Sequence, residues 1–318
     1  MRRIAWVVAL SLVSGSALAA EYTCSQVRLV VPYPAGGATD VATRVISERL
    51  EAGLKKTVVV ENRAGATGNV GTHAVVNASA DGCTLLVNAT VIGTFPHSFS
   101  KLNYDPFKDL APVGGIGITP VLIVAAPSVE ANDLKSLIDW SKRKTDGLNY
   151  STAGYGLQQH LAVEELAQRS GGKFTHVAYR GGGPAMTDLI AARLDFGAFL
   201  AGTTKPLLED GKLKALAIAQ DKRSELVPQI PTTAEQGFAG MNAGTHFLLF
   251  APAATPKDVV AMLSTELRRI IESPAIKERF TKIGFDPTPL SADQAAAALR
   301  KTGEDYAPLI KKLDIKLD

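Results

Sequence analysis

The chain has 318 residues, of which 46% are hydrophobic and 20% are charged, an ordinary composition for a globular protein long enough for two domains. The formal net charge is only +3, and two of these charges come from Arg2 and Arg3, so no basic stripe indicates nucleic-acid binding. Aromatic residues make up only 6% of the chain, which argues against a stacking surface for bases.

The first 19 residues have the pattern of a secretory signal peptide. Arg2 and Arg3 form a positive segment, residues 4–13 are apolar, and small residues at 17 and 19 fit cleavage after Ala19. The apolar run is too short to span a membrane, and no later run of about 18 apolar residues follows. We therefore expect a soluble protein that is exported to the periplasm.

The first element of the mature chain is a strand at residues 27–31, a β-branched and aliphatic run. Pro32 and Pro34 end it, because proline cannot donate a hydrogen bond to a neighbouring strand. Gly36 and Gly37 then allow a sharp turn, and apolar residues recur at helical spacing as far as Gly53, the predicted C-cap. The order of strand, glycine loop and helix start leaves free N–H groups at a positive helix end, which suits an anion.

The glycine loop matches neither of the two common nucleotide-binding loops, because it has no Lys-Ser/Thr pair and no GxGxxG spacing. Asp40, just after it, has two compatible interpretations. As a structural residue it favours the first helical turn and lies four residues before Arg44. As a site residue it would accept from a ligand hydroxyl or amine, or act through water, because it repels a carboxylate.

Two more units of this kind follow. A strand at 57–61 precedes a glycine loop and a helix start, and a third strand at 83–87 ends in polar residues. Three successive units indicate a parallel sheet with right-handed crossovers. Ligands of such sheets bind beyond the carboxyl ends of the strands, which here are residues 33–40, 62–68 and 88–92.

The two cysteines, Cys24 and Cys83, each lie just before one of these strands. In an oxidising compartment such a pair is a disulfide candidate. If the two strands are parallel neighbours, both cysteines lie at the same edge of the sheet. The sequence therefore predicts a disulfide, with Cys–His catalysis as the weaker alternative.

A second series of units follows a crossing strand at 120–125 and an amphipathic helix at 134–144. It alternates strands at 148–151, 174–179, 194–200 and 213–219 with helices at 160–169, 184–192 and 205–210, the second helix starting at a proline. A strand at 245–251 and helices at 256–271, 274–283 and 292–313 complete the chain, with a possible break near Gly303 or Pro308.

This order predicts an α/β fold of two lobes, each a mainly parallel sheet flanked by helices. Lobe 1 takes in residues 20–123 and 242–318, and lobe 2 takes in residues 124–241. Glycine loops then line both walls of a cleft between the lobes, which is a favoured place for a ligand and closes by hinge motion.

No catalytic or metal-binding pattern stands out. The five histidines show no HExxH and no metal-ligand spacing, and no GxSxG motif is present, so we expect no metal and no cofactor. Three hypotheses remain: a receptor that feeds a transporter, a receptor that signals to a membrane sensor, and an exported hydrolase that uses Ser151 or His160. Saturable binding without turnover separates the receptors from the hydrolase.

Six stretches carry a family likeness that covers nearly the whole mature chain: VVPYPAGGATDVATRV, VENRAGATGNVGT, ADGCTLLVN, LNYDPFKDLAPV, LNYSTAGYGLQQHLAVEEL and HVAYRGGGPAMTDLIAARLDF. They resemble the Bug, or TctC-like, extracytoplasmic solute receptors, the binding components of tripartite tricarboxylate transporters. The resemblance implies a type II periplasmic-binding-protein fold, a small organic mono- or dicarboxylate as ligand, no catalysis and transporter subunits as partners. We further expect a monomer that binds no nucleic acid.

In that family, the first loop and the facing loop of the second lobe hold a ligand carboxylate through backbone N–H groups and waters. Tyr155 and residues 157–159 are bulkier here than is usual, and Tyr155 would suit either an aromatic acid or simple packing. The ligand-binding residues that the resemblance implies are Tyr33, Pro34, Ala35, Gly36, Gly37, Thr39, Asp40, Ala66, Thr67, Thr90, Thr152, Ala153, Tyr155, Gly156, Leu157, His160, Gly182 and Asp195.

Overall fold

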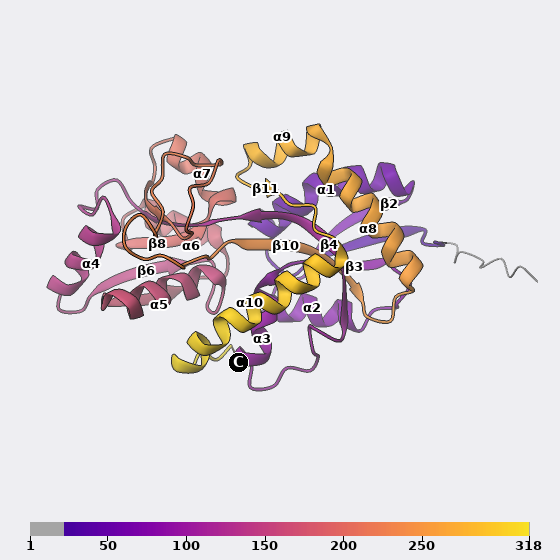
Figure 1. Cartoon of the computed structure of the whole chain (residues 1–318), viewed down its shortest axis with the longest axis horizontal. Coiled ribbons are helices and arrows are strands. Elements are labelled where there is room, and N and C mark those ends of the chain that lie inside the picture. Colours follow the sequence, from indigo (N-terminus) through magenta and orange to yellow (C-terminus); the bar gives the residue numbers. More distant parts are fainter. Residues whose placement is uncertain (1–21, 318) are drawn as a thin grey trace, which may run out of the picture.

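The computed structural model describes residues 22–317, which form two α/β lobes, each built around its own sheet (Figure 1). The strand order is β11-β4-β10-β3-β1-β2 in the first sheet and β7-β6-β8-β5-β9 in the second. The predicted α/β class is confirmed, but the sheets are mixed and not mainly parallel, because at least half of the strand pairs in each are antiparallel. The signal peptide predicted at 1–19 lies outside the described residues. Among the helices that are described, none combines the length and the hydropathy needed to cross a membrane.

Lobe 1 holds the six-stranded sheet and the helices that cover it. Strand β1 pairs in parallel with β2 and β3, as the repeated units predict, whereas β10 is antiparallel to β3 and β4. The elements are β1 (Gln26–Val31), α1 (Ala38–Leu54), β2 (Thr57–Asn62), η1 (Ala66–Gly68), α2 (Asn69–Val76), β3 (Thr84–Ala89), η2 (Thr90–Thr94), α3 (Phe95–Ser98), β4 (Leu110–Thr119), β10 (Thr245–Pro252), α8 (Lys257–Glu272), α9 (Pro274–Lys282), β11 (Asp286–Pro287) and α10 (Ala292–Lys312).

Lobe 2 holds the five-stranded sheet. Strand β6 is parallel to β7 and β8, while β5 is antiparallel to β8 and β9. Since β5 belongs wholly to this sheet, the chain crosses between the lobes at Pro120, and the boundary predicted between 123 and 124 falls inside β5. The elements are β5 (Val121–Ala125), α4 (Leu134–Arg143), β6 (Leu148–Thr152), α5 (Gln158–Ser170), β7 (Phe174–Ala178), α6 (Gly182–Ile190), β8 (Phe196–Leu200), α7 (Ala201–Glu209) and β9 (Lys214–Ile218).

Several glycines serve close packing where the sequence suggested a break or a loop. Gly53 is not the C-cap of α1: the helix ends at Leu54, and its C-cap is Lys55, whose φ is +53°. A Cβ at Gly53 would lie 1.6 Å from the Glu266 carboxylate, so the glycine allows α8 to approach. Strand β4 escaped prediction because its glycines resemble a loop, yet at Gly115 a Cβ would lie 2.5 Å from a backbone oxygen of Thr288.

Two helices differ from prediction in a similar way. Helix α10 runs without a break through Gly303 and Pro308, and Gly303 again marks a close approach, because its Cβ would lie 2.5 Å from Gly93 O. Pro184 is the third residue of α6 and not the first, since the helix starts at Gly182.

The lobes are joined at the crossing by the side chain of Thr119. Its Oγ1 donates to Gly284 O of lobe 1 (2.9 Å) and accepts from Gly202 N of lobe 2 (3.0 Å). Helix α10 extends from lobe 1 towards α5 of lobe 2 (Figure 1). Leu317, which follows this helix, also contacts both lobes: its N–H donates to Ser98 O of lobe 1, and its side chain packs on Gly156 of lobe 2.

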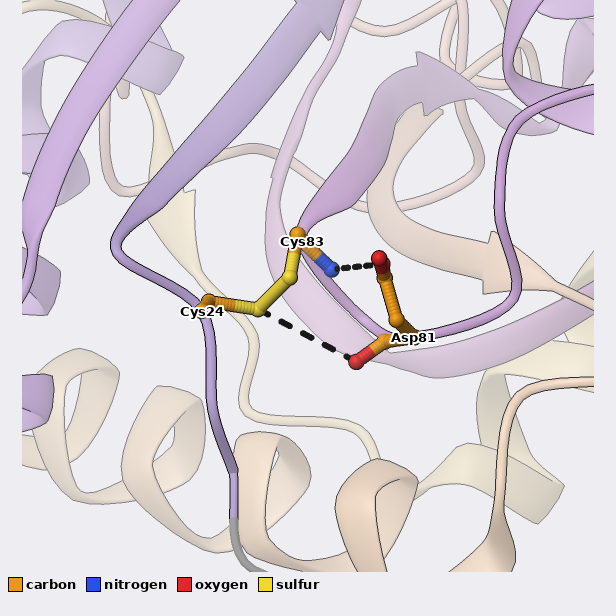
Figure 2. Close-up of side chains that lie close together, drawn as sticks. All are labelled: Cys24, Asp81 and Cys83. Carbon is orange, nitrogen blue, oxygen red and sulfur yellow. Dashed lines mark hydrogen bonds between the residues drawn. A yellow bond between two sulfur atoms is a disulfide. The ribbon is translucent and has the colours of Figure 1, made fainter.

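The predicted disulfide is present between Cys24 and Cys83, with their Cα atoms 5.5 Å apart (Figure 2). It joins the segments that lead into β1 and β3, which are adjacent parallel strands. Asp81 lies beside the sulfurs, and its carboxylate accepts from Cys83 N. Because the bridge uses both sulfurs, this group is no metal site, and neither cysteine is available as a nucleophile.

Candidate functional site

Loops at the carboxyl ends of strands from both lobes line a cleft of about 1060 Å³. On the lobe-1 side the main contribution is the loop between β1 and α1 (residues 32–37), here called the lobe-1 loop. On the other side it is the loop between β6 and α5 (residues 153–157), called the lobe-2 loop. Residues 64–68 after β2 and 179–184 after β7 complete the walls, and Thr245 and Phe247 of β10 also face the cleft.

Most of the residues that the resemblance implied do line this cleft. They are Tyr33, Pro34, Ala35, Gly36, Gly37, Thr39, Ala66, Thr67, Ala153, Tyr155, Leu157 and Gly182. Asp40, Thr90, Thr152, Gly156 and His160 are buried directly behind the lining residues. They are placed to support the cleft and not to face it.

Asp195 lies elsewhere. It precedes β8, so it stands at the amino end of a strand whose carboxyl end faces the cleft. Its carboxylate accepts from Lys144 Nζ and from Asn149 N, both at 2.8 Å. These bonds tie β8 to the start of β6, and the side chain is not placed to contact a ligand in the cleft.

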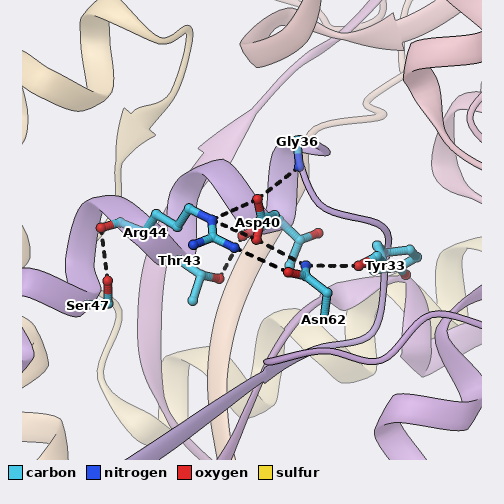
Figure 3. A network of polar contacts seen from close by, with 8 residues as sticks. Tyr33, Gly36, Asp40, Thr43, Arg44, Ser47 and Asn62 are labelled. Atoms are coloured by element: carbon cyan, nitrogen blue, oxygen red, sulfur yellow. Dashed lines mark hydrogen bonds and ion pairs between the residues drawn. The ribbon is translucent and has the colours of Figure 1, made fainter. Parts of the chain in front are cut away.

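Asp40 fixes the lobe-1 loop from behind (Figure 3). Its carboxylate accepts from Gly36 N (2.9 Å), from Arg44 Nε (3.0 Å) and from Asn62 Nδ2 (3.0 Å). Burial alone would raise the pKa of Asp40, but the hydrogen bonds from Arg44, Gly36 and Asn62 outweigh it and lower that pKa. Asn62 also donates to Tyr33 O, so the network holds both ends of the loop. The structural interpretation of Asp40 therefore has direct support.

His160 fixes the lobe-2 loop in a comparable way. Its Nδ1 accepts from Gly156 N at 3.2 Å, and its side chain is almost fully buried. Burial, with a contribution from nearby His176, lowers the pKa of His160 from 6.5 to about 3. The imidazole is therefore neutral at neutral pH.

Three helices present uncapped amino ends at the cleft. Helices α1, α5 and α6 have no side-chain hydrogen bond at the N-cap, which is also true of α2, α8 and α9, whereas α4 and α10 have such caps. Helices α2 and α7 also start at the cleft, but their first N–H groups are already bonded: Asn69 N and Val70 N donate to Ala66 O and Gly65 O, and Ala201 N and Gly202 N donate to Pro120 O and Thr119 Oγ1. Unpaired first-turn N–H groups and the helix dipole favour an anion.

The side chains of the cleft fit the same kind of ligand. Among the described residues that line it, Arg180 is the one with a charged side chain, and it forms no ion pair or hydrogen bond within residues 22–317. Tyr33 Oη, Gln158 Oε1 and Thr245 Oγ1 are buried without a hydrogen-bond partner there. Burial raises the pKa of Tyr33, so its hydroxyl remains a donor. The cleft thus offers positive charge, donors and apolar walls, and no carboxylate.

Sequence reasoning missed several lining residues. Arg180 directly follows the strand predicted at 174–179, so the rule about strand ends was sufficient to find it. Thr245 and Gln158 gave no local signal, because their role depends on where the returning strand and α5 meet: Gln158 Nε2 donates to Gly244 O.

The described residues do not form the catalytic pair that an exported hydrolase would need. Ser151 Oγ is buried and has no hydrogen-bond partner among residues 22–317. It faces Gly197 of β8, where an added Cβ would lie 3.0 Å from it. Because Ser151 Oγ bonds to no described residue, it does not form a nucleophile and base pair with His160, whose Nδ1 accepts from Gly156 N.

Comparison with known proteins gives a consistent picture. Residues 42–315 match the family model described as the tripartite tricarboxylate transporter family receptor. The periplasmic binding protein BugD is 31% identical, with a TM-score of 0.85 over 92% of this chain and 98% of its own. The R. palustris protein Rpa4515 with adipate is 29% identical (TM-score 0.87, 92% and 98% covered). MatC from Rhodopseudomonas palustris with bound malate is 29% identical (TM-score 0.84, 90% and 98% covered).

Proposed function

Because the chain belongs to the tripartite tricarboxylate transporter receptor family, we propose that it is a periplasmic receptor for a small organic carboxylate. It captures this mono- or dicarboxylate between its lobes and delivers it to a membrane transporter of the tripartite tricarboxylate type. The observation that carries the proposal is the convergence of three uncapped helix ends and Arg180 on a cleft whose described lining has no acidic side chain.

Each part of the cleft has a role in this function. Backbone N–H groups at the starts of α1 and α5 bind the carboxylate, directly or through water, from opposite walls. The hydroxyls of Tyr33 and Thr245 are further donors, and Gln158 Oε1 accepts from a ligand hydroxyl, an amine or a water. The relatives that hold adipate and malate support an organic acid as the ligand class. The receptor binds and releases this acid without changing it.

Motion of the lobes gives the ligand its entry and exit. The loops approach each other across the cleft at Gly181 and Pro34, where a Cβ added to the glycine would lie 3.8 Å from Pro34 Cγ. Only the crossing at Pro120 and the segment 219–244 connect the sheets, and Thr119 bonds to both lobes at the first of these. This arrangement suits hinge closure around a bound anion.

The binding step is tested with the mature protein, in a thermal-shift and calorimetric screen of malate, succinate, adipate and benzoate. Each acid is paired with its neutral amide as a matched control. We expect one-to-one saturable binding, a raised melting temperature and no product after long incubation. The proposal fails if no acid binds, or if the amides bind as tightly as the acids.

Delivery to a transporter is tested separately, by uptake of the labelled acid in cells that lack this gene. Uptake at low concentration should be lost and should return with the wild-type gene. Unchanged uptake would leave a receptor without the transport role.

A further inference from the structure

The two cleft loops share one backbone arrangement. Gly36 N donates to Asp40 Oδ2 in lobe 1, and Gly156 N donates to His160 Nδ1 in lobe 2. In both lobes the acceptor is the third residue of a helix that starts at the cleft, and the donor is the residue before the N-cap. Both glycines have left-handed backbones, with φ of +81° and +73°. The arrangement resembles a capping box displaced by one residue.

The two acceptors differ in charge, and this matters next to an anion site. A carboxylate in the first turn of a helix opposes the positive end that would hold the ligand. In lobe 1 the charge of Asp40 is balanced by Arg44, whose Nε lies 3.1 and 3.0 Å from the two carboxylate oxygens. In lobe 2 the acceptor is an imidazole. Because Nδ1 accepts from Gly156 N, the proton of the neutral ring resides on Nε2, 3.7 Å from Glu164 Oε1.

A second histidine supports the same loop. Thr152 Oγ1 donates to Gly154 O (3.0 Å) and lies 2.8 Å from His176 Nε2, so the Nε2 proton points at the hydroxyl. The ring centroids of His160 and His176 are 4.2 Å apart, and Tyr155 covers His160 at 4.5 Å. Thr152 and the two histidines therefore support the lobe-2 loop from the side that faces the protein interior.

The charged and titratable groups that surround His160 are compatible with a neutral imidazole. Glu164 lies on the same helix, and its Oε1 accepts from Tyr150 Oη of β6 at 2.6 Å. His176 faces the ring from β7, and Tyr155 faces it from the lobe-2 loop. Burial and the negative charges of Glu164 and of Asp314, which follows α10, raise the pKa of Tyr155. None of these described neighbours is a lysine or arginine that could pair with a carboxylate at position 160.

From these contacts we infer that His160 is a positioning residue, the lobe-2 counterpart of Asp40. It fixes the lobe-2 loop through Gly156 N and keeps the amino end of α5 free of negative charge. The loop then presents Ala153, Tyr155 and Leu157 to the cleft, with the first N–H groups of α5 next to them. The inference rests on the proposed function, since it concerns how this cleft binds a carboxylate.

Three substitutions separate the two parts of the inference. His160→Asn and His160→Leu have side chains of the same shape, but only Asn keeps an acceptor near the position of Nδ1. His160→Asp keeps the acceptor and adds a charge. Affinity for malate and for adipate is measured by calorimetry at pH 7.5, and exchange of the Gly156 amide hydrogen is followed by NMR in the ligand-free protein.

We expect the Asn variant to bind within about threefold of wild type and to keep Gly156 protected. The Leu variant should bind about tenfold more weakly and exchange Gly156 faster, because the buried N–H loses its acceptor. The Asp variant should keep Gly156 protected but also bind about tenfold more weakly, because a carboxylate at the amino end of α5 repels the ligand. Equal affinities of the Leu and Asn variants, or of the Asp and Asn variants, would overturn the corresponding part.

Failure of the proposed function gives a different result. If the wild type binds none of the four acids of the screen, the receptor function is contradicted, while Gly156 exchange still decides whether His160 positions the loop. If a variant does not fold, the ¹⁵N chemical shifts of the His160 ring in the wild-type protein show whether Nδ1 accepts from Gly156 N. A protonated Nε2 and a bare Nδ1 at pH 7 are expected, and the other tautomer or an imidazolium would refute the role.

Discussion

Acid should destabilise this protein through the histidines behind the lobe-2 loop. Burial and the neighbouring His176 lower the pKa of His160 from 6.5 to about 3, and burial lowers that of His176 to about 4. The unfolded chain therefore takes up protons near pH 6.5, while the folded chain does so only at pH 3–4. Between these values the unfolded state binds more protons, so stability is greatest above pH 6.5 and falls as the pH falls.

The size of the effect follows from the shift. One histidine contributes up to about 1.4 kcal/mol per pH unit in this window. Between pH 7.5 and pH 5.0, His160 should therefore remove about 2 kcal/mol from the free energy of unfolding. His176 acts in the same direction and to a similar extent, because its pKa of about 4 also lies below this pH range.

Urea denaturation at pH 7.5, 6.5, 5.5 and 5.0 measures this dependence. His160→Asn removes the titrating group and keeps an acceptor for Gly156 N, so it should lose about 2 kcal/mol less than wild type over this range. His97→Asn, at an exposed position on lobe 1, is the matched control and should follow wild type. The reasoning is refuted if wild type and His160→Asn lose the same stability.

Three further predictions concern the disulfide and two arginines. Replacing Cys24 and Cys83 by serine should lower the free energy of unfolding by about 4 kcal/mol in urea denaturation, because the bridge spans 59 residues; a loss under about 1 kcal/mol would contradict this. Arg44→Met leaves the charge of Asp40 unbalanced beside α1, so calorimetry should show carboxylate binding weakened about fivefold. Arg180→Gln should weaken adipate about tenfold and hexanoate little, since a dicarboxylate offers a second anion; equal losses would exclude that role. The matched controls, exposed arginines outside the cleft lining, are Arg49→Met and Arg143→Gln.

The parallel units were predictable because each strand is a short aliphatic run followed by a glycine loop and a helical period. Strand β4 was not, because Gly114, Gly115 and Gly117 look like loop residues. Their reason is tertiary: the chain around Thr288 and Leu290 packs against the strand and leaves no room for a Cβ at Gly115. Glycine marks a turn at Gly36 and a close contact at Gly53, and local sequence does not distinguish the two.

The same limit applies to the site. The loops that line the cleft could be predicted, since strand ends of one sheet share an edge. Whether a residue in such a loop faces the ligand or supports the loop depends on distant partners. Asp40 is held by Asn62 from the next strand, and the ring of His160 lies against that of His176 from another strand, so neither assignment follows from the local motif.

The residue four positions further along each helix explains why one lobe tolerates an aspartate and the other has a histidine. In α1 that residue is Arg44, which pairs with Asp40. In α5 it is Glu164, whose Oε1 lies 3.7 Å from His160 Nε2. An acid at position 160 would therefore face another acid, whereas a neutral imidazole does not repel it.

This reasoning predicts the outcome of a double-mutant cycle. His160→Asp combined with Glu164→Arg recreates in lobe 2 the pairing of Asp40 with Arg44, so it should recover most of the malate affinity that His160→Asp loses. Glu164→Arg alone is the necessary control, because Glu164 also accepts from Tyr150 Oη. A positive coupling of about 1 kcal/mol between the two sites would be expected from a restored ion pair at a helix start. Strict additivity would mean that charge at the third helical position does not govern binding at this helix end.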